Sequence, residues 1–280
     1  MEAVLAQKRR IRSPVGAGLF YPEDKMEILD YFRSFGLDSG RDNGTQTAQA
    51  IIAPHGAWHY SGALAAQAFL TTVGRKNIKR VVILGPIHDK RERGLFLSNS
   101  HSFYTPLGNI PVDHEISEEL EFNSNFFEIN DIPHLAEHSI EILLPFIKYC
   151  FPDASIVPVL MGQPKAQYIY DLAQALRKAV TPVLDDTLIV VSSNLSYDSD
   201  QAAAKRLALE CIRLFSERRA GELASAILEG RLNACGGALV AGLLESGLLD
   251  KTETCLIADD LVSATGNENA VVYYSELSYI

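Results

Sequence analysis

Residues 80–88 of the chain read RVVILGPIH, in which one arginine is followed by the apolar run VVIL and then by Gly-Pro-Ile-His. A strand with one face in water alternates apolar and polar residues, whereas a strand covered by helices on both faces is apolar throughout. The stretch therefore predicts a buried strand of an α/β sheet, with polar groups following its carboxyl end.

Segments on both sides of this strand have either strand-like or helical spacing of their apolar residues. Strand-like runs are found at residues 48–53, 155–160, 187–191, 252–257 and 270–278. Helical spacing is found at residues 22–35, 62–72, 115–122, 139–151, 166–180, 201–218, 222–229 and 236–246. Because strands alternate with helices, we expect one α/β domain over residues 1–280, with a central mixed or mostly parallel sheet and helices on both faces. Residues 1–12 are expected to form a flexible tail and residues 39–47 a loop.

The composition limits the partners and the compartment that we expect. The chain of 280 residues has a formal net charge of -10, and an acidic surface repels phosphate backbones, so no nucleic acid partner is expected. None of the four cysteines forms a CxxC pair, which argues against a disulfide framework and favours a reducing compartment, the cytoplasm. We find neither a signal peptide nor an apolar run of the ~18 residues that a membrane helix needs, so no membrane partner is expected.

Polar side chains directly follow three of the predicted strands. His55 follows strand 48–53 after one proline, His88 follows strand 80–84 after Gly-Pro-Ile, and the run SSNLSY follows strand 187–191. Open α/β sheets bind ligands at the carboxyl ends of their strands, and proline helps to fix the direction in which the chain leaves the sheet. Two imidazoles directed into one crevice are the beginning of a metal site.

Cys235 is the candidate for a third ligand. It precedes two glycines and a predicted apolar helix, where a thiolate gains from the positive end of the helix dipole. Each of the three residues also has an ordinary structural interpretation. A histidine at a strand end is often only hydrogen-bonded, and an intracellular cysteine is usually a small core residue.

Nine short segments, taken together and in order, resemble the Memo family, also called AmmeMemoRadiSam system protein B. They are AGLFYP at 17–22, APH at 53–55, YSG at 60–62, LGPIH at 84–88, TPLG at 105–108, EHSIE at 137–141 with LP at 144–145, VLMG at 159–162, VSS at 191–193 and ACG at 234–236. The resemblance extends from about residue 14 to the C-terminus, and EHSIE with LP is its most specific part.

The resemblance implies a fold like that of the class III extradiol ring-cleavage dioxygenases, which bind Fe(II) through two histidines and a carboxylate. It implies that His55 and His88 are the two histidine ligands and that Cys235 takes the place of the carboxylate. His138 resembles the histidine that lies near the substrate in those enzymes. Because a thiolate is a softer ligand than a carboxylate, we expect Fe(II) first, then copper or zinc, and a metal-free protein also remains open.

Two residues depart from the family's pattern after strand 187–191. The family usually has an SSDLSH-like run where this chain has SSNLSY, so Asn194 stands for an aspartate and Tyr197 for a histidine. The absent histidine resembles the general base of the dioxygenases, and a tyrosine with a usual pKa of ~10 is a poor base at neutral pH. His138, Asn194 and Tyr197 are therefore the candidate catalytic residues.

The sequence leaves two main functions open. The first is a metal-dependent, dioxygenase-like oxidoreductase that acts on a small organic molecule. The second is a non-catalytic binding or scaffold protein on a degenerate dioxygenase fold, whose cleft holds a small molecule or a peptide. A zinc hydrolase ranks last, because only Glu137 and Glu141 are available as its general base. The family name implies pathway partners that resemble radical-SAM and AMMECR proteins, and the sequence does not predict the oligomeric state.

Overall fold

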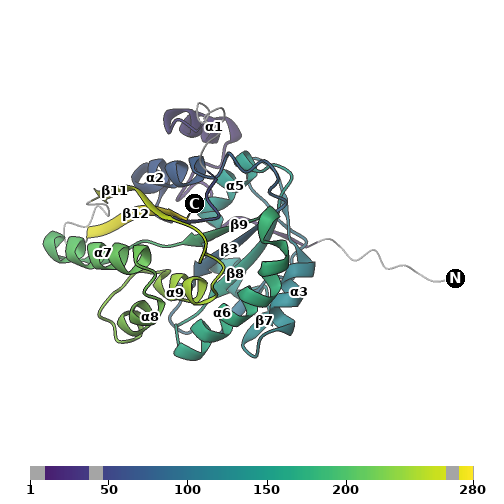
Figure 1. The fold of residues 1–280 in the computed structure, drawn as a ribbon. Helices are drawn as coiled ribbons and strands as arrows, with labels where there is room; N and C mark the ends of the chain where they lie inside the picture. Colours follow the sequence, from purple (N-terminus) through teal and green to yellow (C-terminus); the bar gives the residue numbers. More distant parts are fainter. Residues whose placement is uncertain (1–9, 38–46, 263–270, 280) are drawn as a thin grey trace.

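The apolar run at residues 80–88 forms strand β3 (Arg80–Pro86), which lies in the middle of the central sheet (Figure 1). The computed structural model describes residues 10–37, 47–262 and 271–279. Successive residues of β3 face two different hydrophobic cores, with Val81 and Ile83 in one and Val82 and Leu84 in the other. After Arg80 the strand is apolar because both of its faces are covered, as the sequence predicted.

The sheet is mixed, and its central strands are parallel. Its strands in spatial order are β10 (Ser196–Asp198), β12 (Val271–Tyr279), β2 (Ala50–Ala53), β9 (Thr187–Ser192), β3, β8 (Ser155–Met161), β4 (Leu95–Leu97) and β7 (Phe127–Ile129), while β11 (Thr254–Val262) pairs with β12. The four strands β2, β9, β3 and β8 run parallel, and β12 and β4 join them in the antiparallel direction. Ala53 is opposite Ser192 and Leu84 is opposite Val191, so the carboxyl ends of β2, β9 and β3 lie side by side.

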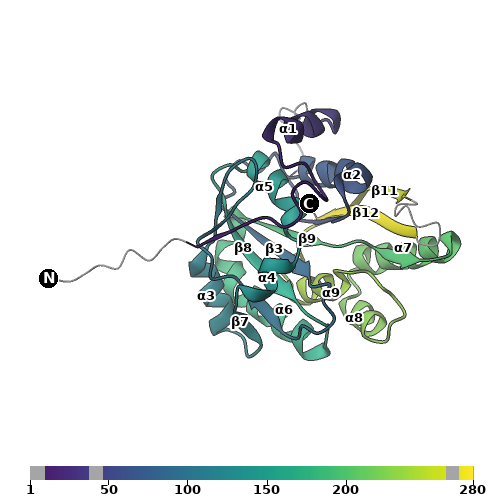
Figure 2. The same ribbon diagram turned by 180° about the vertical axis from the view of Figure 1, so that it is seen from behind.

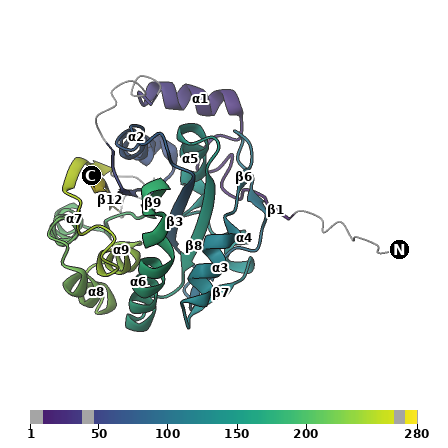
Figure 3. The ribbon, with the colours of Figure 1, turned by 45° about the vertical axis from the view of Figure 1, so that its right-hand side comes forward.

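Helices cover both faces of this sheet, and all three ribbon views show the two layers (Figures 1, 2 and 3). One layer contains α1 (Lys25–Ser34), α2 (Trp58–Leu70) and α5 (Leu144–Cys150). The other contains α3 (His114–Phe122), α6 (Ala166–Val180), α7 (Gln201–Ser216), α8 (Ala220–Leu228) and α9 (Gly237–Glu245). The fold is therefore a single mixed α/β domain, as predicted. Among the described residues, no helix combines the length and the apolar character that crossing a membrane requires.

The structure differs from the predicted elements mainly where a segment is short or contains a proline. The predicted helix 139–151 is a 3-10 turn (Glu141–Leu143) followed by α5, because Pro145 favours the first turn of a new helix. The predicted helix 62–72 begins earlier, at Trp58, which packs in the core with 2% of its surface exposed. Strands β4 and β7 were not predicted, since three residues are too few to show a period.

The prediction of a tail over residues 1–12 is wrong at its end. Strand β1 (Ile11–Arg12) pairs with β5 (Ser102–Phe103), which pairs in turn with β6 (Ile110–Pro111) in a small second sheet. Residues 1–9 and most of the predicted loop 39–47 lie outside the described residues.

Arg12 joins this N-terminal strand to the segment that precedes α5. Its side chain is 1% exposed and forms an ion pair with Glu141, which is equally buried. The guanidinium also donates to the backbone carbonyls of His134, at 2.9 Å, and Glu137, at 2.8 Å. A guanidinium cannot give up its charge in a protein, so a buried one requires several acceptors, and Arg12 has them.

The carboxylate of Glu141, the partner of Arg12, likewise has several hydrogen-bond donors. It accepts the backbone N–H groups of Val15, at 2.9 Å, and Gly16, at 2.7 Å. It also accepts the Tyr21 hydroxyl at 2.9 Å, and burial together with the charge of Glu141 raises the pKa of Tyr21 far above its usual value. We call Arg12, Tyr21 and Glu141 the Arg12–Glu141 cluster. The cluster explains why a segment without strong periodicity is part of the fold.

Candidate metal centre

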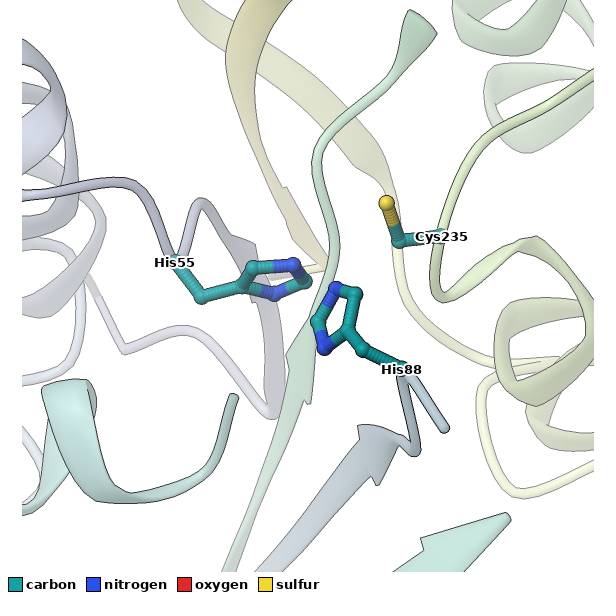
Figure 4. Close-up of side chains that lie close together, drawn as sticks. All are labelled: His55, His88 and Cys235. Carbon is teal, nitrogen blue, oxygen red and sulfur yellow. The ribbon is translucent and has the colours of Figure 1, made fainter. Parts of the chain in front are cut away.

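The three predicted ligands lie together at the carboxyl ends of the parallel strands. One ligand atom from each of His55, His88 and Cys235 lies within 4.8 Å of the other two. Figure 4 shows the rings of His55 and His88 facing each other, with Cys235 beside them. The ring centroids are 5.2 Å apart and the ring planes are nearly perpendicular, at 83°. The structure thus brings together three residues that are far apart in the sequence.

His55 is buried, and its hydrogen bonds determine which ring nitrogen carries the proton. Its Nδ1 lies 2.7 Å from the Ser192 hydroxyl, which donates its only hydrogen to the Ser139 carbonyl, also at 2.7 Å. Ser192 must therefore accept from Nδ1–H, which leaves a lone pair on Nε2. This Nε2 is the one buried side-chain nitrogen or oxygen without a hydrogen-bond partner among the residues that the structure describes.

Burial keeps the His55 ring neutral. Desolvation, followed by the nearby rings of His88 and His138, holds the pKa of His55 well below its ordinary value. A buried polar atom without a partner costs free energy, commonly ~1–3 kcal/mol, unless something binds it. A neutral imidazole with a free lone pair is the form of histidine that binds metals.

His88 is held in the matching orientation by Glu137. The Glu137 carboxylate accepts both the backbone N–H of His88, at 2.7 Å, and its Nδ1–H, at 3.0 Å, so Nε2 faces the group. Burial lowers the pKa of His88, but hydrogen bonds with Cys235 and Glu137 outweigh burial and raise the pKa to about 10. A metal ion at Nε2 would have to displace that proton, and the negative charges of Cys235 and Glu137 would compensate its charge.

Glu137 supports a second histidine as well. One of its carboxylate oxygens accepts the backbone N–H groups of His138 and Ser139, each at 2.8 Å, and lies 3.3 Å from Nδ1 of His138. Burial raises the pKa of Glu137, but the hydrogen bond and charge of His88 and the backbone donors lower it to about 2. Glu137, His88 and His138 are also close enough to hold an ion, but the carboxylate is already engaged by these donors.

His138 lies beside the predicted ligands. Its ring is stacked on His88, with centroids 4.9 Å apart, and on Phe20, at 4.5 Å. Burial is the main reason that the pKa of His138 is lowered from its ordinary value, so the ring is neutral at neutral pH. A neutral histidine with a quarter of its side chain exposed, at 25%, can accept a proton from a molecule bound nearby.

Cys235 reaches the site because the chain before α9 packs closely against the end of β9. The Cys235 N–H donates to the Asn194 carbonyl at 3.1 Å, and the Gly236 N–H donates to the Ser193 hydroxyl at 2.9 Å. A Cβ on Gly236 would lie 2.5 Å from the Ser192 carbonyl oxygen, so only glycine permits this approach. Among the cysteines whose side chains the structure describes, Cys235 is exposed, whereas Cys211 is buried and Cys150 is half-buried.

Asn194 and Tyr197, the two residues that depart from the family's pattern, lie in different environments. The side-chain oxygen of Asn194 accepts the backbone N–H of His55 at 3.1 Å, so this residue connects two of the predicted ligands. The Tyr197 side chain is on β10 and 54% exposed, and Asn233 holds only its backbone. Their catalytic roles stay predictions.

Two residues that shape the site were not predicted as functional. Ser192 fixes the tautomer of His55, and Ser139 accepts the Ser192 hydrogen and donates its own hydroxyl to the Pro86 carbonyl at 2.7 Å. Both serines lie within the segments that carry the family resemblance, VSS and EHSIE. The family resemblance could therefore have drawn attention to these two serines. It could not reveal their role, because a serine gives no local indication that it orients a distant histidine.

A cavity of about 350 Å³ opens beside the group, and its lining includes His88 and Cys235. Most of its other walls are apolar and come from the chain after β3 and β8 and from the start of α9. The volume lies within the range of ~300–1,000 Å³ that is typical of small-molecule sites.

Fold and site together define an α/β protein with a candidate metal centre at the carboxyl ends of its central strands. The family model of the Memo-like proteins matches residues 12–278, so the chain belongs to the Memo family. A MEMO1 family protein of Thermotoga neapolitana is 32% identical over 246 residues, which cover 85% of this chain and 88% of that protein. One of Methanobrevibacter smithii is 30% identical and covers 89% of this chain and 92% of its own length.

Among solved structures, an uncharacterized protein of Escherichia coli K12 matches with a TM-score of 0.49 and 12% identity. The match covers 81% of this chain and 98% of that one, and a likeness this distant says nothing about function.

Proposed function

We propose that the chain binds one transition-metal ion through Nε2 of His55, Nε2 of His88 and Sγ of Cys235. One observation carries the proposal: the Nε2 lone pair of His55 is buried and has no partner among the described residues, while a ligand atom of His55 lies within 4.8 Å of ligand atoms of the other two residues. The Glu137 carboxylate behind His88 and the Ser192 hydroxyl behind His55 are the kind of outer partners that orient histidine ligands.

Fe(II) is the ion that we propose first, with copper or zinc as the alternatives. Two imidazoles and a thiolate are too soft a donor set for magnesium or calcium, which prefer oxygen. Three protein ligands leave coordination positions open, and such a site can bring oxygen and an organic molecule together.

The reaction class that we propose is a dioxygenase-like oxidation of a small organic molecule. The bound metal would supply the redox chemistry, and the chain's own residues would orient the substrate and move its proton. His138 is neutral, partly exposed and next to His88, so it is the residue that we propose as the proton acceptor. The cavity that borders His88 and Cys235 would hold the substrate.

A non-catalytic binding protein is the second candidate, and Asn194 and Tyr197 favour it. Asn194 cannot take part in proton transfer at neutral pH, and its side chain is engaged with the backbone of His55. Tyr197 is a poor base and is largely exposed. Under this alternative, the same cavity would hold a small molecule or peptide without turnover, and partners resembling radical-SAM or AMMECR proteins would use it as a scaffold.

A zinc hydrolase is disfavoured by the contacts of its two candidate bases. Glu137 accepts hydrogen bonds from His88, His138 and Ser139, and Glu141 is paired with Arg12. A carboxylate whose pKa is about 2 is a weak general base near neutral pH.

Metal analysis of anaerobically purified protein tests the metal site. We expect about one ion per chain in the wild type and a large loss in Cys235→Ala and His55→Ala. Cys150→Ala is the matched control, because it removes a thiol outside the group and should leave the metal content unchanged. A wild type without iron, copper or zinc, or a Cys235→Ala variant with undiminished metal, would contradict the proposal.

Oxygen consumption with a panel of catechols then separates the two candidate functions. Turnover that disappears in Cys235→Ala and His138→Ala supports the oxidoreductase. Binding of the panel without any oxygen consumption by the metal-loaded protein supports the binding protein instead.

A further inference from the structure

The walls of the cavity beside the metal centre carry information about the ligand that it accepts. Ile87, Met161, Leu232 and Leu239 are buried residues of its lining, and each is less than a tenth exposed. Such walls favour an apolar ligand body, because they remove its surface from water. A volume of about 350 Å³ is near the lower end of the usual range for ligand sites, which suits one ring or a short chain.

A lysine, Lys90, belongs to the lining of this cavity. Its neighbours Arg91 and Arg93 are engaged: Arg91 pairs with Asp89 at 2.6 Å, and Arg93 donates to the carbonyls of Lys90 and Glu92. Lys90 itself forms no ion pair with any residue that the structure describes. In a chain with a net charge of -10, this lysine brings a positive charge to the wall of an apolar cavity, where it can attract an anion.

The lining therefore combines three kinds of chemistry. It contains the thiol of Cys235 and the imidazole of His88, several apolar side chains, and Lys90. A ligand that fits both would have a donor atom directed at the metal centre, an apolar body and an anionic group. The first turn of α9 also borders the cavity, through Ala238 and Leu239, and its dipole adds positive potential.

We propose that the cavity takes a small organic anion, a carboxylate with an aromatic or aliphatic body, and that Lys90 selects for its charge. This inference rests on the proposed function in one respect only: it names the substrate class of the same site. Lys90 is a specificity residue here, since it contacts the anionic group and not the reacting atoms.

Three monosubstituted benzenes of similar size test the charge preference: benzoate (anionic), benzyl alcohol (neutral) and benzylamine (cationic). They are titrated against the full-length chain at low salt, both metal-free and loaded with Fe(II) under anaerobic conditions. We expect benzoate to bind more tightly than the other two, and its preference to shrink as salt screens the contact. Lys90→Met should weaken benzoate roughly three- to five-fold and leave benzyl alcohol unchanged.

Two further variants test whether the probes bind in this cavity. Lys178→Met changes an exposed lysine of α6 outside the lining and should leave every affinity unchanged. Gln163→Trp fills the cavity and should abolish binding of all three probes, while circular dichroism shows a folded protein. Equal binding of the three probes, or an equal effect of Lys90→Met on benzoate and benzyl alcohol, would overturn the charge assignment. Absence of binding, or binding unchanged by Gln163→Trp, would overturn the assignment to this cavity.

Metal content, measured on the same samples, separates this inference from the proposed function. If the chain binds no metal but prefers benzoate in a manner that depends on Lys90, the metal proposal fails and the ligand class stands. If the metal is present and depends on Cys235 but benzoate is not preferred, only the ligand class fails.

Discussion

The Arg12–Glu141 cluster and the candidate metal centre are both buried polar groups, but only the first is complete. In the cluster, Arg12 and Glu141 face each other, and the remaining donors and acceptors find backbone or hydroxyl partners. In the metal centre, Nε2 of His55 has none among the described residues. Burying a polar atom costs free energy unless it is paired. A complete cluster therefore stabilises the fold, whereas the open lone pair of His55 is the feature on which we base the proposed metal site.

The two groups are also connected, since they share one segment of the chain. Residues 137–141 provide Glu137 and His138 to the candidate metal centre and Glu141 to the cluster. Arg12 donates to the Glu137 carbonyl, so the cluster holds the backbone from which the Glu137 side chain reaches His88. The comparison predicts that changes in the cluster alter stability, while changes in the metal centre alter metal affinity.

The largest expected effect comes from Arg12→Met. It leaves the Glu141 carboxylate buried without its counter-charge, so we expect the free energy of unfolding to fall by about 3–5 kcal/mol. Urea denaturation of the metal-free protein measures it. Arg33→Met removes an exposed ion pair with Asp30 on α1 and should cost no more than about 0.5 kcal/mol. Similar losses in the two variants would show that the cluster is not what holds the N-terminal segment.

The next effect is a loss of stability in acid that involves His134. This histidine is 2% exposed, and burial is the main cause that lowers its pKa to about 4. The unfolded chain, with an ordinary pKa of ~6.5, binds the proton more readily, so stability falls as the pH decreases from about 6.5 to about 4. His134 alone contributes about 3 kcal/mol to this loss of stability. The lowered pKa values of His55 and His138 cause a further loss of stability in acid.

Urea denaturation at pH 7 and pH 4 tests this contribution. His134→Gln retains a donor for the Phe96 carbonyl and cannot be protonated, so its acid loss should be smaller than that of the wild type. Equal acid losses in the two proteins would contradict the assignment. Glu137, whose pKa is lowered to about 2, loses its contribution to stability between about pH 4.5 and pH 2, so most of that loss lies below pH 4 and is common to both proteins.

A smaller effect, on metal affinity, is expected for Glu137→Gln. The variant cannot accept from His88 and the backbone with both oxygens, so the orientation of the His88 ring is less well fixed. Loss of such an outer partner typically weakens metal binding about 10- to 100-fold. Competition with a chelator measures it, with the exposed Glu115→Gln of α3 as control. An unchanged affinity would separate Glu137 from the metal centre.

The smallest effect on stability is expected for Cys235→Ala in the metal-free protein. Cys235 is exposed, and its side chain is not part of a complete buried network, so the change should be within about 0.5 kcal/mol. Thermal unfolding measures it beside Arg12→Met. A loss of several kcal/mol would mean that Cys235 is structural, and the contrast between the two regions would disappear.

Prediction from the sequence succeeded where a long segment has one clear period. Helix α6 has the predicted bounds, residues 166–180, because its apolar stripe is regular over 15 residues. Prediction from the sequence failed at Arg12, because the place of this residue in the fold depends on Glu141, which is 129 positions away. It also could not find Ser192, since the effect of a hydroxyl on a distant imidazole has no local pattern.

By itself, the sequence determined that apolar strands alternate with helices and that His55 and His88 follow two of these strands. Local periodicity reports which faces of a segment are buried, and a chain composed of such segments has few ways to cover them. Only the tertiary structure decided that β9 lies between β2 and β3 and that Cys235 arrives beside both histidines. The order of strands and the free lone pair of His55 depend on contacts between distant segments, which no local pattern encodes.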